Sequence, residues 1–301
     1  AAIALILLIG WAKPASSPSP LQPGIPTTVV PVPEPTIKVV VENLEIPWDI
    51  AFLPNGDLLI TERPGRLSII KADGQKQPIP FSAVNPAGEG GLLGLTLHPN
   101  FATNHWLYIY YGLPSGVGSK NRVVRYRLDG ITLADEKIII DDIPGAIYHD
   151  GGRLEFGPDG LLYVTTGDAG QSSLAQQKSS LAGKILRLKD DGTIPDGNPF
   201  GTAVYSFGHR NPQGLAWDDD GRLWSTEHGR SGVLSGLDEI NLIQAGGNYA
   251  WPLIQGDETR VGLITPVANS GPDETWAPAS AAIMNGRLYF GGLRGEALYE
   301  A

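Results

Sequence analysis

A short unit that recurs along the chain constrains the fold more than any other feature. Each copy joins a turn to a strand-like run of apolar and aromatic residues, and the copies read PNGDLLIT, HPNFATNHWLYIYY, GPDGLLYVTT, DDDGRLWSTE and MNGRLYFGG. Asn-Gly and Asp-Gly turns typically connect paired antiparallel strands. No long segment repeats apolar residues at helical spacing, so we expect an all-β fold with few helices.

The spacing of the turns predicts a β-propeller. Their anchor residues lie 48, 56, 61 and 65 residues apart and are Gly56, Asn104, Gly160, Gly221 and Gly286. Each interval accommodates about four short strands with their loops, which is the size of one propeller blade. Five anchors predict five blades, or six with one end missing. An irregular β-sandwich is the alternative.

The first 36 residues differ from the rest of the chain. Residues 1–15 are mostly apolar, which is typical of a secretion signal and too short for a membrane span of about 20 residues. Residues 16–36 are rich in Pro and Ser and predict an extended linker. We expect a signal remnant or an uncleaved anchor, then the linker, then a propeller over 37–301. This predicts a periplasmic or secreted protein, although residues 1–15 could instead form a buried core segment.

Composition excludes several classes of function. The formal net charge is −10 and no run of Lys or Arg occurs, so the protein would repel a phosphate backbone and nucleic acid is not an expected partner. The chain has no cysteine. Disulfides, Cys-ligated zinc, iron–sulfur clusters and thiol nucleophiles are therefore excluded.

A candidate general base lies in the stretch YHDGGRLEFGPDGLLYVTTGD. His149 and Asp168 are 19 residues apart, with the Asp159-Gly160 turn roughly midway. Two antiparallel strands could therefore return Asp168 to the neighbourhood of His149. A carboxylate bonded to one ring nitrogen fixes the tautomer and makes the other nitrogen more basic. A purely structural histidine is the alternative.

Two further segments carry groups suited to ligands. FGHRNPQGLAW presents Arg210 and Asn211 from a turn, where they could donate hydrogen bonds to carboxylates or carbonyls, or simply satisfy carbonyls in a connecting loop. The Gly-rich loop that follows contains Glu227, Asp238 and Glu239. Calcium binds carboxylate and main-chain oxygens, so this loop is a candidate calcium site, and solvated surface charge is the alternative.

Seven segments together resemble a known family. They are IPWDIAFLPNGDLLITERPGRL, GEGGLLGLTLHPNF, HDGGRLEFGPDGLLYVTTGD, SSLAGKILRL, GHRNPQGLAW, DEINLIQAGGNYAWP and LYFGGLRGEALY. In this order they resemble the soluble pyrroloquinoline-quinone (PQQ) dependent aldose sugar dehydrogenases, the glucose/sorbosone dehydrogenase family. The resemblance implies a six-bladed propeller with PQQ over its central mouth. Because the family continues beyond GGLRGEALYEA, it also implies that the final blade is incomplete and the chain truncated.

The resemblance implies a role for each matching residue. His149 would be the general base, oriented by Asp168, that takes the proton of the anomeric hydroxyl of an aldose while hydride passes to PQQ, giving a lactone. The electron acceptor is unknown. The implied PQQ contacts are Glu89, Arg210, Asn211, Gly292, Leu293 and Arg294. The resemblance implies that the backbone carbonyls of Gly229 and Arg230 bind a calcium ion that polarises the quinone. It also implies a second, structural calcium bound by Glu239 and the carbonyl of Tyr249.

Two other functions are compatible with a propeller, because fold does not fix function. One is a calcium-dependent lactonase, which needs carboxylates converging on a central metal and has no use for Arg210 and Arg294. The other is a non-catalytic propeller that binds a glycan or a protein. The joint presence of His149, Asp168, Arg210 and Arg294 favours the dehydrogenase.

Overall fold

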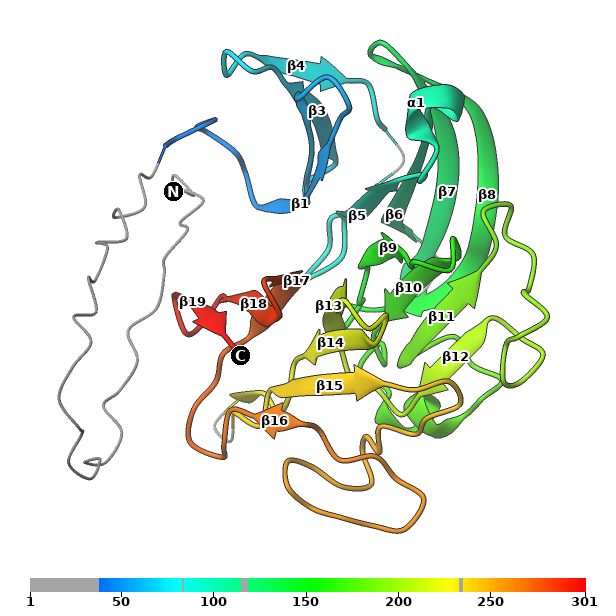
Figure 1. Ribbon diagram of the computed structural model, residues 1–301, viewed down its shortest axis with the longest axis vertical. Helices are drawn as coiled ribbons and strands as arrows, with labels where there is room; N and C mark the ends of the chain where they lie inside the picture. Colours follow the sequence, from blue (N-terminus) through cyan, green and yellow to red (C-terminus); the bar gives the residue numbers. More distant parts are fainter. Residues whose placement is uncertain (1–37, 83, 115–118, 233–234) are drawn as a thin grey trace, which may run out of the picture.

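Five antiparallel sheets arranged around a common centre make up the part of the chain that the structure describes (Figure 1). The structure is a computed structural model, and it describes residues 38–82, 84–114, 119–232 and 235–301. The predicted signal or anchor at 1–15 and the predicted linker at 16–36 lie outside these residues. Among the described residues no helix is long and apolar enough to cross a membrane.

Each sheet is built from strands that are consecutive in the chain. The first sheet contains β1 (Pro47–Phe52), β2 (Leu58–Glu62), β3 (Arg66–Ile70) and β4 (Lys76–Ile79). The second contains β5 (Leu92–Leu97), β6 (Trp106–Pro114), β7 (Ser119–Asp129) and β8 (Thr132–Gly145). The third contains β9 (Leu154–Phe156), β10 (Leu162–Thr166), β11 (Lys184–Leu188) and β12 (Val204–Phe207).

The last two sheets continue the pattern. The fourth contains β13 (Pro212–Trp217), β14 (Leu223–Glu227), β15 (Glu239–Ile243) and β16 (Ala268–Asn269). The fifth contains β17 (Pro278–Met284), β18 (Arg287–Gly292) and β19 (Ala297–Glu300). The named helices are both short, α1 (Phe101–Asn104) and the 3₁₀ helix η1 (Ser172–Gln176). The expectation that helices are minor holds for these residues.

The prediction of a six-bladed propeller with an incomplete final blade is wrong: the described residues form five sheets. The physical reason lies in the turns. Every anchor residue occupies the connection between the first and second strands of one sheet, so five anchors produce five sheets. At Gly56 and Gly160 the turn requires φ of +86° and +73°, which glycine adopts without a steric penalty. The turn count left six blades with one end missing as an alternative, and the family resemblance implied six. A sixth blade has no anchor of its own among the five turns.

Apolar clusters fill the spaces between neighbouring sheets. The alternation of side chains along a strand sends successive residues to opposite faces. In β6, Leu107 and Ile109 pack toward the first sheet, whereas Tyr108 and Tyr110 pack toward the third. Two further clusters join the third sheet to the fourth and the fourth to the fifth. The innermost strands β1, β5, β9, β13 and β17 contact one another in that order (Figure 1).

Strand direction sorts the connecting loops onto two faces. In every sheet the first and second strands are antiparallel and joined by the anchor turn. The loops that precede each first strand and follow each second strand therefore gather at the end away from the anchor turns. We call this end the site face and the end with the anchor turns the turn face.

We expect Leu186→Ala to lower the free energy of unfolding by about 2–5 kcal/mol, because Leu186 is fully buried between the second and third sheets and its truncation leaves a cavity. Urea unfolding checks the value. Val267→Ala is the control, since Val267 is 59% exposed and its truncation should change stability by less than about 0.5 kcal/mol. Equal effects of the two substitutions would contradict the packing described above.

Candidate active site

The structure places the imidazole of His149 against the carboxylate of Asp168 on the site face. Nδ1 of His149 lies 2.7 Å from Oδ1 of Asp168. His149 precedes β9 and Asp168 follows β10, and the antiparallel pairing of these strands brings the two residues to the same end of the sheet. The spacing in the sequence predicts this proximity, while the catalytic role of the pair stays a prediction.

Hydrogen bonds keep the Asp168 carboxylate ionised although it is 1% exposed. Its Oδ1 accepts the Gly170 amide at 2.8 Å, and its Oδ2 accepts the Trp251 indole N–H at 2.8 Å. Burial raises the pKa of Asp168, but these donors together with His149 hold the pKa below its ordinary value. A charged Asp168 makes Nδ1 of His149 the protonated nitrogen. Nε2 then carries the lone pair that a base needs.

The backbone of His149 adopts a conformation that is uncommon outside glycine, with φ of 63°. Its N–H donates to Oε2 of Glu89 at 2.8 Å, and its carbonyl accepts the Ala169 amide at 3.2 Å. Gly167 passes directly beside this carbonyl, because a Cβ at residue 167 would lie 1.8 Å from the His149 oxygen. Glu89, a predicted PQQ contact, therefore also holds the candidate base in position.

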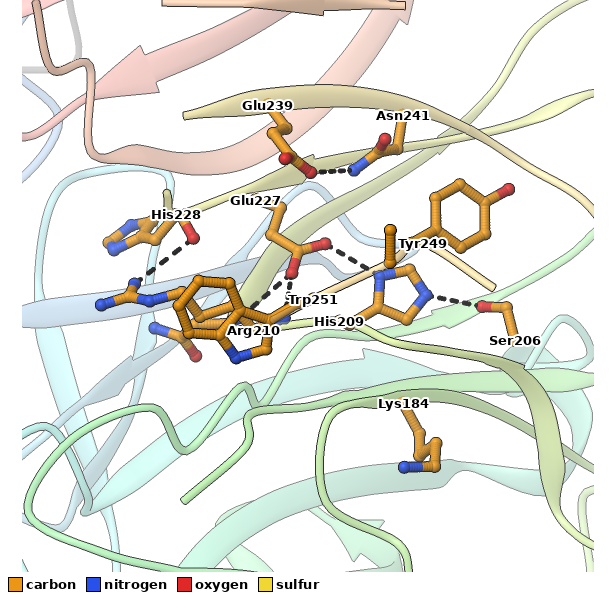
Figure 2. Close-up of polar contacts among 12 residues, drawn as sticks. Lys184, Ser206, His209, Arg210, Glu227, His228, Glu239, Asn241, Tyr249 and Trp251 are labelled. Carbon is orange, nitrogen blue, oxygen red and sulfur yellow. Dashed lines mark hydrogen bonds and ion pairs between the residues drawn. The ribbon is translucent and has the colours of Figure 1, made fainter. Parts of the chain in front are cut away.

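A buried carboxylate organises the loop that carries Arg210 and Asn211 (Figure 2). Oε1 of Glu227 accepts both backbone amides, that of Asn211 at 3.2 Å. Oε2 of Glu227 lies 2.8 Å from Nδ1 of His209, and Nε2 of His209 lies 2.8 Å from the Ser206 hydroxyl. Glu227, which the sequence suggested as a calcium ligand, thus uses both oxygens to fix this loop.

The guanidinium of Arg210 is a buried cation at the site. It donates to the Ser231 hydroxyl at 2.7 Å and to the His228 carbonyl at 3.3 Å, and it lies 5.4 Å from the centre of the Trp251 ring. Burial lowers the pKa of Arg210, while the nearby carboxylates of Asp168, Glu227, Glu89 and Asp238 raise it. The ordinary pKa of arginine is so high that the side chain stays charged.

Asn211 is oriented so that its amide nitrogen is available to a ligand. Its Oδ1 accepts the Gly151 amide at 3.0 Å and the Gln213 side chain at 3.1 Å. Its Nδ2 makes no hydrogen bond to another described residue. Asn211 is 1% exposed, and its surroundings together with these two hydrogen bonds fix the direction of the side chain. Asn211 also links the Arg210 loop to the glycines that follow His149.

Three of the predicted calcium ligands line one small pocket, together with Arg210 and Trp251. These ligands are Gly229, Arg230 and Glu239. Burial, and then the neighbouring Glu227, raises the pKa of Glu239. Oε2 of Glu239 accepts the Asn241 amide at 3.0 Å, and the buried Oδ1 of Asn241 has no hydrogen-bond partner among the described residues. A bound cation would stabilise the charged form of Glu239 and would give the Asn241 oxygen a partner.

Two of the backbone carbonyls predicted to bind calcium already accept hydrogen bonds. The Arg230 carbonyl accepts the Gly236 amide at 3.4 Å, and the Tyr249 carbonyl accepts the Trp251 amide at 3.0 Å. A carbonyl has a second lone pair, so either could still bind a cation. Tyr249 stacks on His209 with ring centres 4.6 Å apart (Figure 2). Within the described ranges no three His, Cys, Asp or Glu side chains are grouped to hold a metal.

Gly292 ends β18, and Leu293 and Arg294 follow it on the site face. The Leu293 amide donates to the Ala277 carbonyl at 3.0 Å, and the Arg294 amide donates to the Trp276 carbonyl at 3.3 Å. Leu293 is 79% exposed and Arg294 is also exposed. No hydrogen bond joins this turn to His149 or Asp168 among the residues described. The structure thus places the turn on the same face as the candidate base, without a hydrogen bond between them.

Asp238 connects this part of the fifth sheet to the Gly229 loop. One carboxylate oxygen accepts the Gly229 amide at 2.8 Å, and the other accepts the amides of Trp276 and Ala277 at 2.6 and 2.9 Å. The second oxygen also accepts the Thr275 hydroxyl at 2.8 Å. Asp238, another suggested calcium ligand, is therefore fully used in holding the loop.

Sequence reasoning missed Trp251, whose indole donates to Asp168 and covers Arg210. The residue lies 83 positions after Asp168, in the loop between β15 and β16. The only available signal is its place in NYAWP, one of the segments that carry the family resemblance. No spacing argument could have paired it with the carboxylate.

Comparison with known proteins identifies close relatives of the chain. The sequence model of the family described as Glucose / Sorbosone dehydrogenase matches residues 44–299. Aldose sugar dehydrogenase YliI of Escherichia coli is 38% identical over 72% of the chain, and quinoprotein glucose dehydrogenase B of Acinetobacter calcoaceticus is 34% identical over 73%. The aligned regions span 62% and 52% of those two proteins.

A solved structure extends the similarity to the fold. The PQQ-bound form of aldose sugar dehydrogenase from Streptomyces coelicolor superimposes with a TM-score of 0.81 at 41% identity. The match covers 87% of the chain and 79% of that protein. The predicted resemblance to soluble PQQ-dependent sugar dehydrogenases is confirmed.

We expect Asp168→Asn to destabilise the protein by about 1–3 kcal/mol at pH 6, because the amide cannot accept from His149, Gly170 and Trp251 as the carboxylate does. Folding lowers the pKa of Asp168, so the charged carboxylate stabilises the fold fully above about pH 4, and this contribution is lost as the pH falls through the lower folded value. Urea unfolding at several pH values should show the difference from wild type shrinking toward pH 3.

The exposed Asp273→Asn serves as a control and should change stability by less than about 0.5 kcal/mol at either pH. If the stability difference between wild type and Asp168→Asn stays constant from pH 6 to pH 3, these contacts do not lower the pKa of Asp168.

Proposed function

Because the chain belongs to the glucose/sorbosone dehydrogenase family, we propose that it is a PQQ-dependent quinoprotein that oxidises aldose sugars at the anomeric carbon. The observation that carries this proposal is the His149–Asp168 pair, with Nε2 of His149 unpaired among the described residues. The base stands beside a buried arginine linked to it through the backbone, since the Asp168 amide donates to the Arg210 carbonyl at 2.8 Å. A proton acceptor next to a cation suits an anionic cofactor and a hydroxyl substrate.

The residues on the site face fit PQQ, which carries three carboxylates. Arg210 supplies a buried charge, and Asn211 supplies an amide nitrogen without a partner among the described residues. Arg294 would add a second, exposed charge from the fifth sheet. Bound PQQ would supply an oxidant that accepts two electrons as a hydride. Arg210, Asn211 and Arg294 are therefore the donors that would pair with the PQQ carboxylates.

The base would act through Nε2. A sugar whose anomeric hydroxyl points at Nε2 of His149 can pass its proton to that nitrogen, while Nδ1–H stays bonded to Asp168. The ionised Asp168 stabilises the resulting imidazolium, and the Trp251 and Gly170 donors keep the carboxylate aligned. A general base positioned in this way raises the reaction rate about 10²–10⁴-fold.

Glu239 and Asn241 are the residues best suited to bind calcium. Calcium takes six to eight oxygens and favours ionised carboxylates, and the buried Glu239 and the unpartnered Asn241 oxygen both lack compensation without a cation. The carbonyl of Tyr249 would be a further ligand of this structural calcium, and the carbonyls of Gly229 and Arg230 would bind a separate calcium next to the quinone.

We expect the protein refolded with PQQ and Ca²⁺ to reduce an artificial electron-accepting dye when an aldose such as glucose is added. Omitting PQQ should abolish dye reduction, because no residue of the chain can accept a hydride. Dye-reduction rates with a panel of aldoses are the measurement. Absence of dye reduction with every aldose, although PQQ binds, would overturn the proposal.

His149→Asn should lower kcat about 10²–10⁴-fold while leaving PQQ affinity nearly unchanged, because asparagine tolerates the positive φ at this position but is not a base. Equilibrium PQQ binding and steady-state kinetics measure the two quantities. His105→Asn is the matched control, since His105 is an exposed histidine with φ of 57°. If both variants keep full turnover, His149 is not the base.

A further inference from the structure

We propose that a cleft on the turn face, between the third and fourth sheets, is a second binding site that takes a neutral saccharide unit. The cleft encloses about 320 Å³, within the range of about 300–1,000 Å³ that small-molecule sites occupy. Tyr163, Arg187 and Tyr205 line it from the third sheet, and Trp217 and Gln244 line it from the fourth. This site is separate from the proposed dehydrogenase site and does not rest on that proposal.

Topology separates the cleft from the candidate base. Asp159 precedes β10 and Asp168 follows it, so the five-residue strand puts about 13 Å between the two ends. Trp217 ends β13, the strand that begins beside Arg210 and Asn211. The cleft and the His149 site therefore open at opposite ends of the same sheets.

Three aromatic rings form the body of the cleft. Tyr163 meets Tyr205 and Trp217 edge to face, with ring centres 5.3 and 5.0 Å apart. Arg187 lies over both tyrosines, 5.4 Å from the centre of the Tyr205 ring and 5.9 Å from that of Tyr163. Tyr163 is only 4% exposed and holds the half-buried rings of Tyr205 and Trp217 in place, so those two rings offer apolar contact to a ring-shaped ligand.

The charges in the cleft are already compensated. Arg187 donates twice to Oδ2 of Asp159, at 2.9 and 3.1 Å. Arg222 donates to Asp218 at 2.7 Å and pairs with Asp220 at 2.9 Å. A phosphate or carboxylate ligand would have to compete with these pairs. The cleft therefore favours an uncharged ligand.

Polar groups without partners lie next to the rings. The Tyr205 hydroxyl, the Trp217 indole N–H and the Gln244 side-chain amide make no hydrogen bond to any other residue that the structure describes. Tyr205 and Trp217 are half-buried and Gln244 is exposed, so all three can reach a bound molecule. A pyranose matches this arrangement, because it has an apolar C–H face and hydroxyl groups around its edge. Rigid aromatic faces beside donors and acceptors are therefore suited to an uncharged sugar.

The test is binding of methyl β-glucoside and methyl β-cellobioside, which have no anomeric hydroxyl, to the full chain. The indole N–H signal of Trp217 in a ¹H–¹⁵N spectrum should shift saturably, and its disappearance in Trp217→Phe assigns it among the seven tryptophans. Tyr205→Phe and Gln244→Ala should each weaken binding about 2- to 12-fold, the effect of one net hydrogen bond. Neither substitution removes core packing.

Two controls locate the site. Trp224→Phe should leave the affinity unchanged, because the Trp224 indole already donates to Asp218 at 2.9 Å. His149→Asn should also leave it unchanged, whether or not the dehydrogenase proposal holds. The inference is overturned if the Trp217 signal ignores both glycosides at tens of millimolar, if the shift is lost in His149→Asn, or if phenol or inorganic phosphate shifts the signal and the glycosides do not.

Discussion

Strand direction is the constraint on which every other feature of the molecule depends. Each sheet opens with a strand that leaves the site face and continues with one that returns to it. Residues that precede a first strand and residues that follow a second strand therefore lie on the same face of the molecule, whatever the sequences of their loops. His149 and Arg210 belong to the first kind, and Asp168 and Arg294 belong to the second. By repeating one hairpin, the fold places polar side chains from distant segments of the sequence on one face.

Two buried carboxylates and one half-buried carboxylate then fix the geometry of these residues. Glu227 accepts the two amides of the Arg210 loop, Asp238 joins the Gly229 loop to the fifth sheet, and Glu89 holds the His149 amide. These charged acceptors also surround Arg210 and compensate its charge in the ligand-free chain. An anionic ligand must therefore offer Arg210 better hydrogen bonds than the protein does. Recognition on this face depends on geometry and not on a surplus of positive charge.

Short sequence patterns predicted the features that depend on interactions between neighbouring residues. The turn residues predicted the hairpins and their number, and the 19-residue interval around Gly160 predicted that Asp168 would return to His149. The prediction of a sixth blade was wrong because it went beyond the five turns, each of which produces one sheet. Trp251 and the positioning role of Glu227 were not predictable, since their contacts depend on how loops from separate sheets pack together. Sequence spacing carries no information about that packing.

Gly167 sets a limit on how this protein can diversify. Any side chain at that position would collide with the His149 carbonyl, so the backbones of the candidate base and of its orienting carboxylate meet with nothing adjustable between them. Their spacing cannot be tuned by substituting a neighbouring side chain. Changes in what this face can bind must therefore occur in the loops around the pair, which leave the geometry of His149 and Asp168 unchanged.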